Sequence, residues 1–149
     1  NFLCDSSGSI CEVVDPWDAA DPILTALSEN LLMIWIAGSE DHTAELVRRF
    51  DLAPKPMCYQ PEFLMTCWSN YQRETGVQPD KVNPDDFIRW TYARAMAHRQ
   101  PRYAQMAKWG ITLQANDVQN LKTPQDFETL VSDTLEHRAA APRSNGGED

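Results

Sequence analysis

The chain has 149 residues, 42% of them hydrophobic, and its 22 acidic and 13 basic residues give a formal net charge of −9. This is the length of one domain, and the hydrophobic content is enough for a core, so a wholly disordered chain is not expected. An acidic surface repels nucleic acid and anionic lipid, no hydrophobic run approaches the ~20 residues of a membrane span, and four cysteines are too few for a disulfide scaffold. We therefore expect an acidic, cytoplasmic protein without membrane contact.

Hydrophobic runs bounded by turn residues predict three short strands in the first half of the chain, at residues 2–4, 32–37 and 56–59. The middle run is unbroken, which is typical of a parallel strand buried on both faces. Between the runs, Asp21 followed by Pro22 predicts a capped helix start, and a second short helix is expected after Ser39. This half is therefore expected to alternate strands and helices.

The second half is expected to be mainly helical, because its hydrophobic residues recur at helical spacing behind residues typical of helix caps. Helices are expected at 61–76, 83–98 and from 123 onward, with a break near Pro101 and a candidate last strand at 111–113. Residues 139–149 end in Pro-Arg-Ser-Asn-Gly-Gly-Glu-Asp and are expected to be a disordered tail.

These elements predict one α/β domain over residues 1–138, with a small three-layer parallel sheet followed by a helix-rich second half. Ligands of such sheets bind at the carboxyl ends of the strands, where Asp5 and Ser39 are expected to lie. A carboxylate at that place can act as a nucleophile, and successive backbone N–H groups of Ser7, Gly8 and Ser9 can form a nest for phosphate oxygens. The strand ends are therefore the first candidate site.

Residues 3–11, with Asp5 after an apolar run, and residues 34–39, ending in Ser39, resemble the first two motifs of the haloacid dehalogenase superfamily and, within it, the short phage-type phosphatase-like proteins. The resemblance covers roughly residues 1–60 and implies a three-layer sheet of that type. It implies that Asp5 is the nucleophile and that Ser39 donates a hydrogen bond to the phosphate. Ser7 stands where the family has a second Asp, the general acid–base, so hydrolysis of a small phosphate ester or nucleotide is expected to be weakened or absent.

The resemblance also implies a Mg²⁺ ion, held mainly by the Asp5 carboxylate and the Ser7 carbonyl. The family completes this metal site with acids from a later motif and carries a lysine in its third motif. The candidates for these positions are Asp85 and Asp86 as metal ligands, and Lys81 or Lys108 as the lysine.

The candidate residues at the strand ends also have a structural interpretation. Asp5 can close an Asx-turn, in which Ser7 and Ser9 are turn residues. Ser39 can cap a helix by accepting a backbone N–H two or three residues later. In this interpretation the strand ends carry no chemistry.

A binding module is the alternative to an enzyme, because charge is unevenly distributed along the chain. Residues 1–45 contain no Lys or Arg, whereas residues 87–116 contain no acid and hold several aromatic residues among their bases. In the segment 87–109, Arg94, Arg99 and Arg102 are candidates for bracketing an anion, with Tyr103 or Trp109 stacking on a base. The structural alternative places the aromatic residues in a core or a protein interface, with the arginines at its rim. The expected partner is therefore a small phosphorylated molecule or a protein, and nucleic acid only through this segment.

Overall fold

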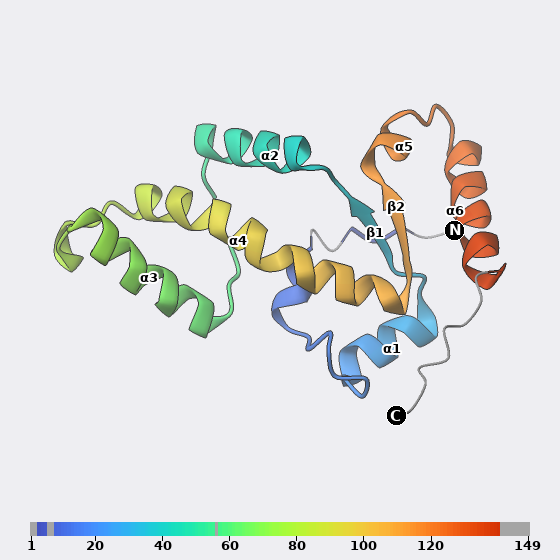
Figure 1. The fold of residues 1–149 in the computed structure, drawn as a ribbon, viewed down its shortest axis with the longest axis horizontal. Helices are drawn as coiled ribbons and strands as arrows, with labels where there is room; N and C mark the ends of the chain where they lie inside the picture. Colours follow the sequence, from blue (N-terminus) through green and yellow to red (C-terminus); the bar gives the residue numbers. More distant parts are fainter. Residues whose placement is uncertain (1–2, 6–7, 56, 141–149) are drawn as a thin grey trace, which may run out of the picture.

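The described residues fold into helices and a two-stranded parallel sheet, which lies toward one end of the molecule (Figure 1). The computed structural model describes residues 3–5, 8–55 and 57–140. Strand β1 (Ile34–Ala37) pairs with β2 (Ile111–Gln114), so that Ile34 faces Ile111 and Ala37 faces Gln114. The helical elements are η1 (Ser9–Glu12), α1 (Pro22–Asn30), α2 (Glu40–Leu52), α3 (Pro61–Thr75), η2 (Pro79–Lys81), α4 (Pro84–Met106), η3 (Ala107–Trp109), α5 (Ala115–Gln119) and α6 (Pro124–Ala140). The protein is therefore α/β with helices predominating.

Local capping explains where several helices begin and end, as the sequence predicts. The Asp21 carboxylate accepts the backbone N–H groups of Ile23 and Leu24 at the start of α1, and the Asn83 side chain accepts that of Asp85 at the start of α4. Helix α3 ends at Gly76, whose φ of 68° lies in the left-handed region that glycine tolerates best. These predictions are confirmed.

The expected sheet of three strands in the first half is not formed by the described residues. Leu3–Asp5 and Met57–Tyr59 lie in no strand, while Phe2 and Pro56 fall outside the described residues. Strand β1 is also not buried on both faces, since Ile36 is 50% exposed. Its partner comes from the second half of the chain, where the strand expected at 111–113 is confirmed, and α6 packs against that partner.

Helix α4 runs without interruption through Pro101, so the expected break there is wrong. A proline inside a helix removes one backbone hydrogen bond and crowds the preceding turn, at a cost of roughly 3 kcal/mol. Arg99 and Arg102, on either side of it, are both buried and bonded to other segments, and these contacts hold the helix together. Tertiary contacts here outweigh local propensity.

Two hydrophobic clusters lie along α4. At its end, Cys11, Val14, Leu24 and Met106 form a small buried core, with Trp109 packed against it. Along its first half, aromatic rings of α2 and α3 pack on those of α4, including Phe50 stacked on Tyr92 with ring centroids 3.8 Å apart. The aromatic residues at 90 and 92 are therefore packing residues, as the structural alternative predicted.

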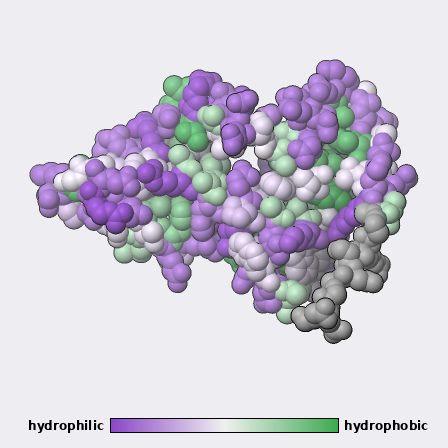
Figure 2. Space-filling view, in the orientation of Figure 1, coloured by the Kyte–Doolittle hydropathy of each residue, from purple (hydrophilic) through white to green (hydrophobic). Residues whose placement is uncertain are grey.

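The two ends of the molecule differ (Figure 1). Helix α3 and the start of α4 form one end, and the sheet with α5 and α6 forms the other. Figure 2 shows a notch in the outline between α2 and α5, above the carboxyl ends of both strands. Helix α6 includes residues 139 and 140, which were expected to belong to the tail, and 141–149 lie outside the described residues.

None of the helices in the described part of the chain combines the length and hydrophobicity needed to cross a membrane.

Gly110, just before β2, lies so close to Met33, just before β1, that a larger residue is not expected to fit there. A Cβ at Gly110 would lie 2.0 Å from the backbone oxygen of Met33, which cannot move without shifting β1. We expect Gly110→Ala to lower the free energy of unfolding, measured by urea denaturation, by about 3 kcal/mol. At Gly38 the nearest atom is the Cβ of His42 at 3.0 Å, so Gly38→Ala should cost about 1 kcal/mol. Equal losses for the two variants would contradict this account of the sheet.

Candidate functional site

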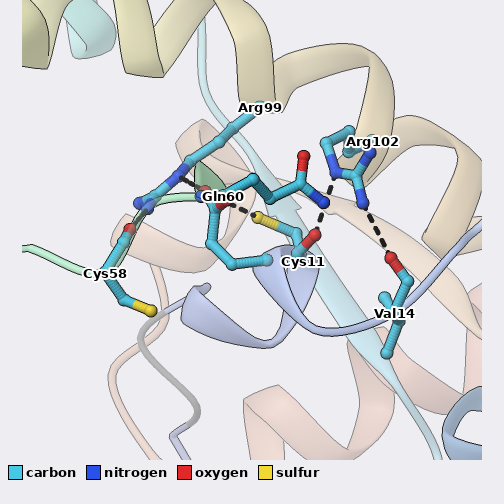
Figure 3. A network of polar contacts seen from close by, with 7 residues as sticks. Cys11, Val14, Cys58, Gln60, Arg99 and Arg102 are labelled. Carbon is cyan, nitrogen blue, oxygen red and sulfur yellow. Dashed lines mark hydrogen bonds and ion pairs between the residues drawn. The ribbon is translucent and has the colours of Figure 1, made fainter. Parts of the chain in front are cut away.

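Three arginines of α4 were expected to bind an anion, and the contacts of each one decide whether it is available to a ligand. Arg99 is 1% exposed, and its Nε lies 2.6 Å from Glu12 Oε1 in a buried ion pair. Its second terminal nitrogen donates to the carbonyl oxygen of Cys58 at 2.6 Å, while Glu12 Oε2 accepts the backbone N–H of Gln60 at 2.9 Å. Arg99 therefore joins η1, residues 57–60 and α4 to one another (Figure 3).

Arg102 holds the N-terminal segment from the next turn of α4. Its Nε donates to the carbonyl of Cys11 at 2.9 Å, and a terminal nitrogen donates to that of Val14 at 2.7 Å (Figure 3). Its guanidinium carbon also lies 5.4 Å from the centre of the Trp17 ring. Both arginines are buried structural groups, so the expectation that they lie at the rim of a core is wrong.

Arg94 is occupied as well. Its guanidinium lies 3.4 Å from the centre of the Trp90 ring, and it pairs with Glu74 at 3.1 Å. None of the three arginines expected to bracket an anion is therefore directed at a common ligand. Lys108, predicted above only as the lysine of the phosphatase-type site, lies in the same segment and is exposed.

Ser39 caps α2 through a reciprocal contact with His42. Its Oγ accepts the backbone N–H of His42 at 3.4 Å, and its own backbone N–H donates to the His42 Nδ1 at 3.2 Å. The structural interpretation of Ser39 is confirmed. Its role as a hydrogen-bond donor to a phosphate stays a prediction.

Asp5 and Gly8 lie in no strand, so the described residues place no strand tip at Asp5. Asp5 is exposed, Ser7 lies outside the described residues, and Ser9 is the first residue of η1. Gly8 has a φ of 72°, and a Cβ placed on it would lie 2.6 Å from Tyr103 Oη. This close approach requires glycine, and burial raises the pKa of Tyr103 to about 12, so its phenol stays neutral beside the loop.

The acids expected to hold Mg²⁺ are not brought together. Asp85 and Asp86 are exposed in the first turn of α4, where Asp86 pairs with Arg89, and Lys81 lies just before this helix. Gly8 lies against the side chain of Tyr103 in the second half of α4. Tyr103 is separated from Asp85 by about 27 Å along the helix axis, at 1.5 Å per residue. The three residues from Gly8 back to Asp5 span at most about 11 Å.

Direct metal ligands lie within roughly 2.6 Å of their ion, so Asp5, Asp85 and Asp86 do not form one site. The described residues contain no group of three or more His, Cys, Asp or Glu side chains placed to hold a metal. Asp85 and Asp86 therefore do not fit a site shared with Asp5, whereas a Mg²⁺ ion held by Asp5 and the Ser7 carbonyl stays a prediction, because Ser7 lies outside the described residues.

Among the described residues that were predicted for a site, Trp109 lines one of two adjoining grooves in the surface, and Lys108 lines both. Both residues belong to η3, between the end of α4 and β2. The first groove has a volume of about 390 Å³ and is lined by Ala104, Ala107, Lys108, Gly110, Ile111, Thr112, Thr134 and Arg138. The second has a volume of about 270 Å³ and is lined by Pro16, Trp17, Ala19, Gln105, Lys108 and Trp109.

The first groove is a locally basic place in an acidic chain. The described residues that line it include two cations and no acid. The guanidinium of Arg138 donates to the backbone oxygens of Gly110 and Lys108, the latter at 2.9 Å, so it occupies carbonyls at the end of η3. A guanidinium carries five N–H donors, and Arg138 retains others for a ligand.

Sequence reasoning missed most residues of these grooves, among them Arg138 and Trp17. Arg138 is a basic residue in the last turn of α6, a position usually explained by the helix dipole. Trp17 lies in the acidic N-terminal segment, far along the chain from the basic one. Neither position carries a local signal for binding.

No family model, curated protein or solved structure matches the chain. The function is therefore argued from the geometry of the grooves.

The buried ion pair predicts a large loss of stability when one partner is removed. Glu12→Gln or Arg99→Met should each lower the free energy of unfolding by about 3–5 kcal/mol, because the remaining group is buried without its partner. The double variant should lose less than the sum of the two.

The control is Arg48→Ala, which removes an ion pair of similar length, 2.7 Å, whose arginine side chain is 63% exposed. That change should cost less than about 1 kcal/mol in the same urea titration. Additive losses for the Glu12 and Arg99 variants would show that the two residues do not act as a pair.

Proposed function

We propose that the protein is a non-catalytic module that binds a small phosphorylated molecule in the groove lined by Lys108 and Arg138. One observation carries the proposal: two cationic side chains and two threonines line the same groove, and no acidic residue accompanies them among the described lining residues. In a chain with a formal net charge of −9, this groove is electrostatically distinct from the rest of the molecule.

The chemistry of the two cations suits a phosphate. An ammonium supplies a compact charge, and a guanidinium supplies donors in a plane that matches two phosphate oxygens. Arg138 is held in place by two backbone oxygens, so little side-chain freedom is lost when an anion binds. Lys108 is exposed, and its contribution is expected to weaken as salt increases.

The lining residues support binding without catalysis. General acid–base catalysis of phosphate-ester hydrolysis uses a positioned group that moves a proton, most often His, Asp or Glu. None of the described residues lining the groove is of these types. A bound phosphate ester would therefore be held intact.

Titration calorimetry with inorganic pyrophosphate tests the phosphate groove. Wild-type protein should bind in the micromolar to millimolar range, and Lys108→Ala should weaken binding about tenfold, because one of the two cations is lost. Raising the salt concentration should weaken wild-type binding more than that of the variant.

The matched control is Lys55→Ala, which removes an exposed lysine between α2 and α3 that lines neither groove and should leave binding unchanged. Equal loss in both variants would mean that net charge alone attracts the anion. The absence of any binding by folded wild-type protein would reject the proposed function.

A phosphatase-type domain of the haloacid dehalogenase kind is the second candidate. The observation in its favour is that Ser39 lies two residues after the last residue of β1, beyond the carboxyl end of a parallel strand. The same position holds the second motif in the resemblance, whose three-layer sheet would need further strands beside the two described ones. The proposal gives Asp5 the role of nucleophile.

Release of phosphate from nucleotides and sugar phosphates, assayed with and without added Mg²⁺, distinguishes the two candidates. The binding module predicts no turnover across the panel. Turnover that Asp5→Asn abolishes, with the variant still folded, would favour the phosphatase-type domain instead.

A further inference from the structure

The second groove beside Lys108 has the composition of a site for a flat ring. Two tryptophans line it, together with a glutamine and the lysine that it shares with the phosphate groove. Trp17 comes from the N-terminal segment and Trp109 from η3, so residues far apart in the sequence form its walls. Aromatic walls with a few polar groups are typical of sites that stack a planar ligand.

Trp17 is exposed and yet fixed. Its side chain is 56% exposed. Because an indole is among the largest hydrophobic side chains, this leaves a large hydrophobic area uncovered. Its backbone N–H donates to the Asp15 carboxylate at 3.1 Å, Pro16 before it is fully buried, and the buried guanidinium of Arg102 lies 5.4 Å from its ring. A preorganised aromatic ring loses little conformational freedom when a ligand covers it.

Trp109 provides the second wall. It packs against the core of Cys11, Val14, Leu24 and Met106, so its position is set by the fold. Gln105 lies one turn before it, and a side-chain amide has both donors and an acceptor for the edge of a base. The groove therefore offers stacking surface together with a hydrogen-bonding group.

Lys108 connects the two grooves, since it lines both. A molecule that fills both must carry a planar ring at one end and a phosphate at the other. We infer that the ligand is a nucleotide, with its base against Trp17 and Trp109 and its phosphates at Lys108 and Arg138. This inference rests on the proposed function and names the class of its ligand.

Three probes separate the contributions of ring and phosphate: ADP, inorganic pyrophosphate and adenosine. Titration calorimetry with wild-type protein should show ADP binding at least tenfold more tightly than pyrophosphate, because only ADP stacks a base. ADP should also bind more tightly than adenosine, which lacks the phosphates. Saturation with ADP should change the tryptophan fluorescence.

Variants of Trp17 test the stacking directly. Trp17→Ala should weaken ADP binding about tenfold and leave pyrophosphate binding unchanged, whereas Trp17→Phe should retain most of the ADP affinity because it keeps an aromatic face. The matched control is Met65→Ala, which removes an exposed hydrophobic side chain from α3. Thermal unfolding of each variant establishes that the fold is retained.

The outcomes separate this inference from the proposed function. If ADP and pyrophosphate bind equally and Trp17→Ala changes neither, the nucleotide is rejected while the phosphate groove stands. If adenosine binds through Trp17 and pyrophosphate does not bind, both the phosphate groove and the nucleotide are rejected. If a proline-rich peptide binds through Trp17 and ADP does not compete with it, the second groove is a peptide site and the inference is overturned.

Discussion

The buried ion pair between Glu12 and Arg99 is the interaction on which the rest of the structure depends. Removing two charges from water is costly, and the pair persists because each partner has a further hydrogen bond: Arg99 to the Cys58 carbonyl and Glu12 to the Gln60 backbone N–H. Through these contacts η1 and residues 57–60 are both attached to one turn of α4. The hydrophobic core nearby contains few fully buried residues, so this polar network supplies much of the order in the N-terminal segment.

This attachment also determines where the grooves form. Arg102, one turn beyond Arg99, binds the carbonyls of Cys11 and Val14 and thereby places the following loop beside the end of α4. Trp17, from the acidic part of the chain, consequently lies in the same groove as Lys108 and Trp109 from the basic part. The two electrostatically unlike regions of the sequence meet at the surface that we propose as the binding site.

The arginines of α4 show why candidate site residues are hard to select from sequence. Arg94, Arg99 and Arg102 look alike as bases among aromatic residues, yet one is stacked on a neighbouring ring and two are buried in the fold. Their roles depend on carboxylate and carbonyl oxygens supplied by residues distant along the chain. Lys108 was among the predicted residues, whereas Arg138 had no signal beyond its place near a helix end.

The sequence by itself determined the helix starts at Asp21, Ser39 and Asn83 and the positions of β1 and β2, because caps and short hydrophobic runs depend on residues only a few positions apart. Only the tertiary structure decided that residues 3–5 and 57–59 form no strand, that α4 continues through a proline, and that the two strands pair with each other. Strand pairing, burial of a charge and the shape of a groove all arise from contacts between distant segments. No local pattern encodes those contacts, so the candidate site emerged from the fold.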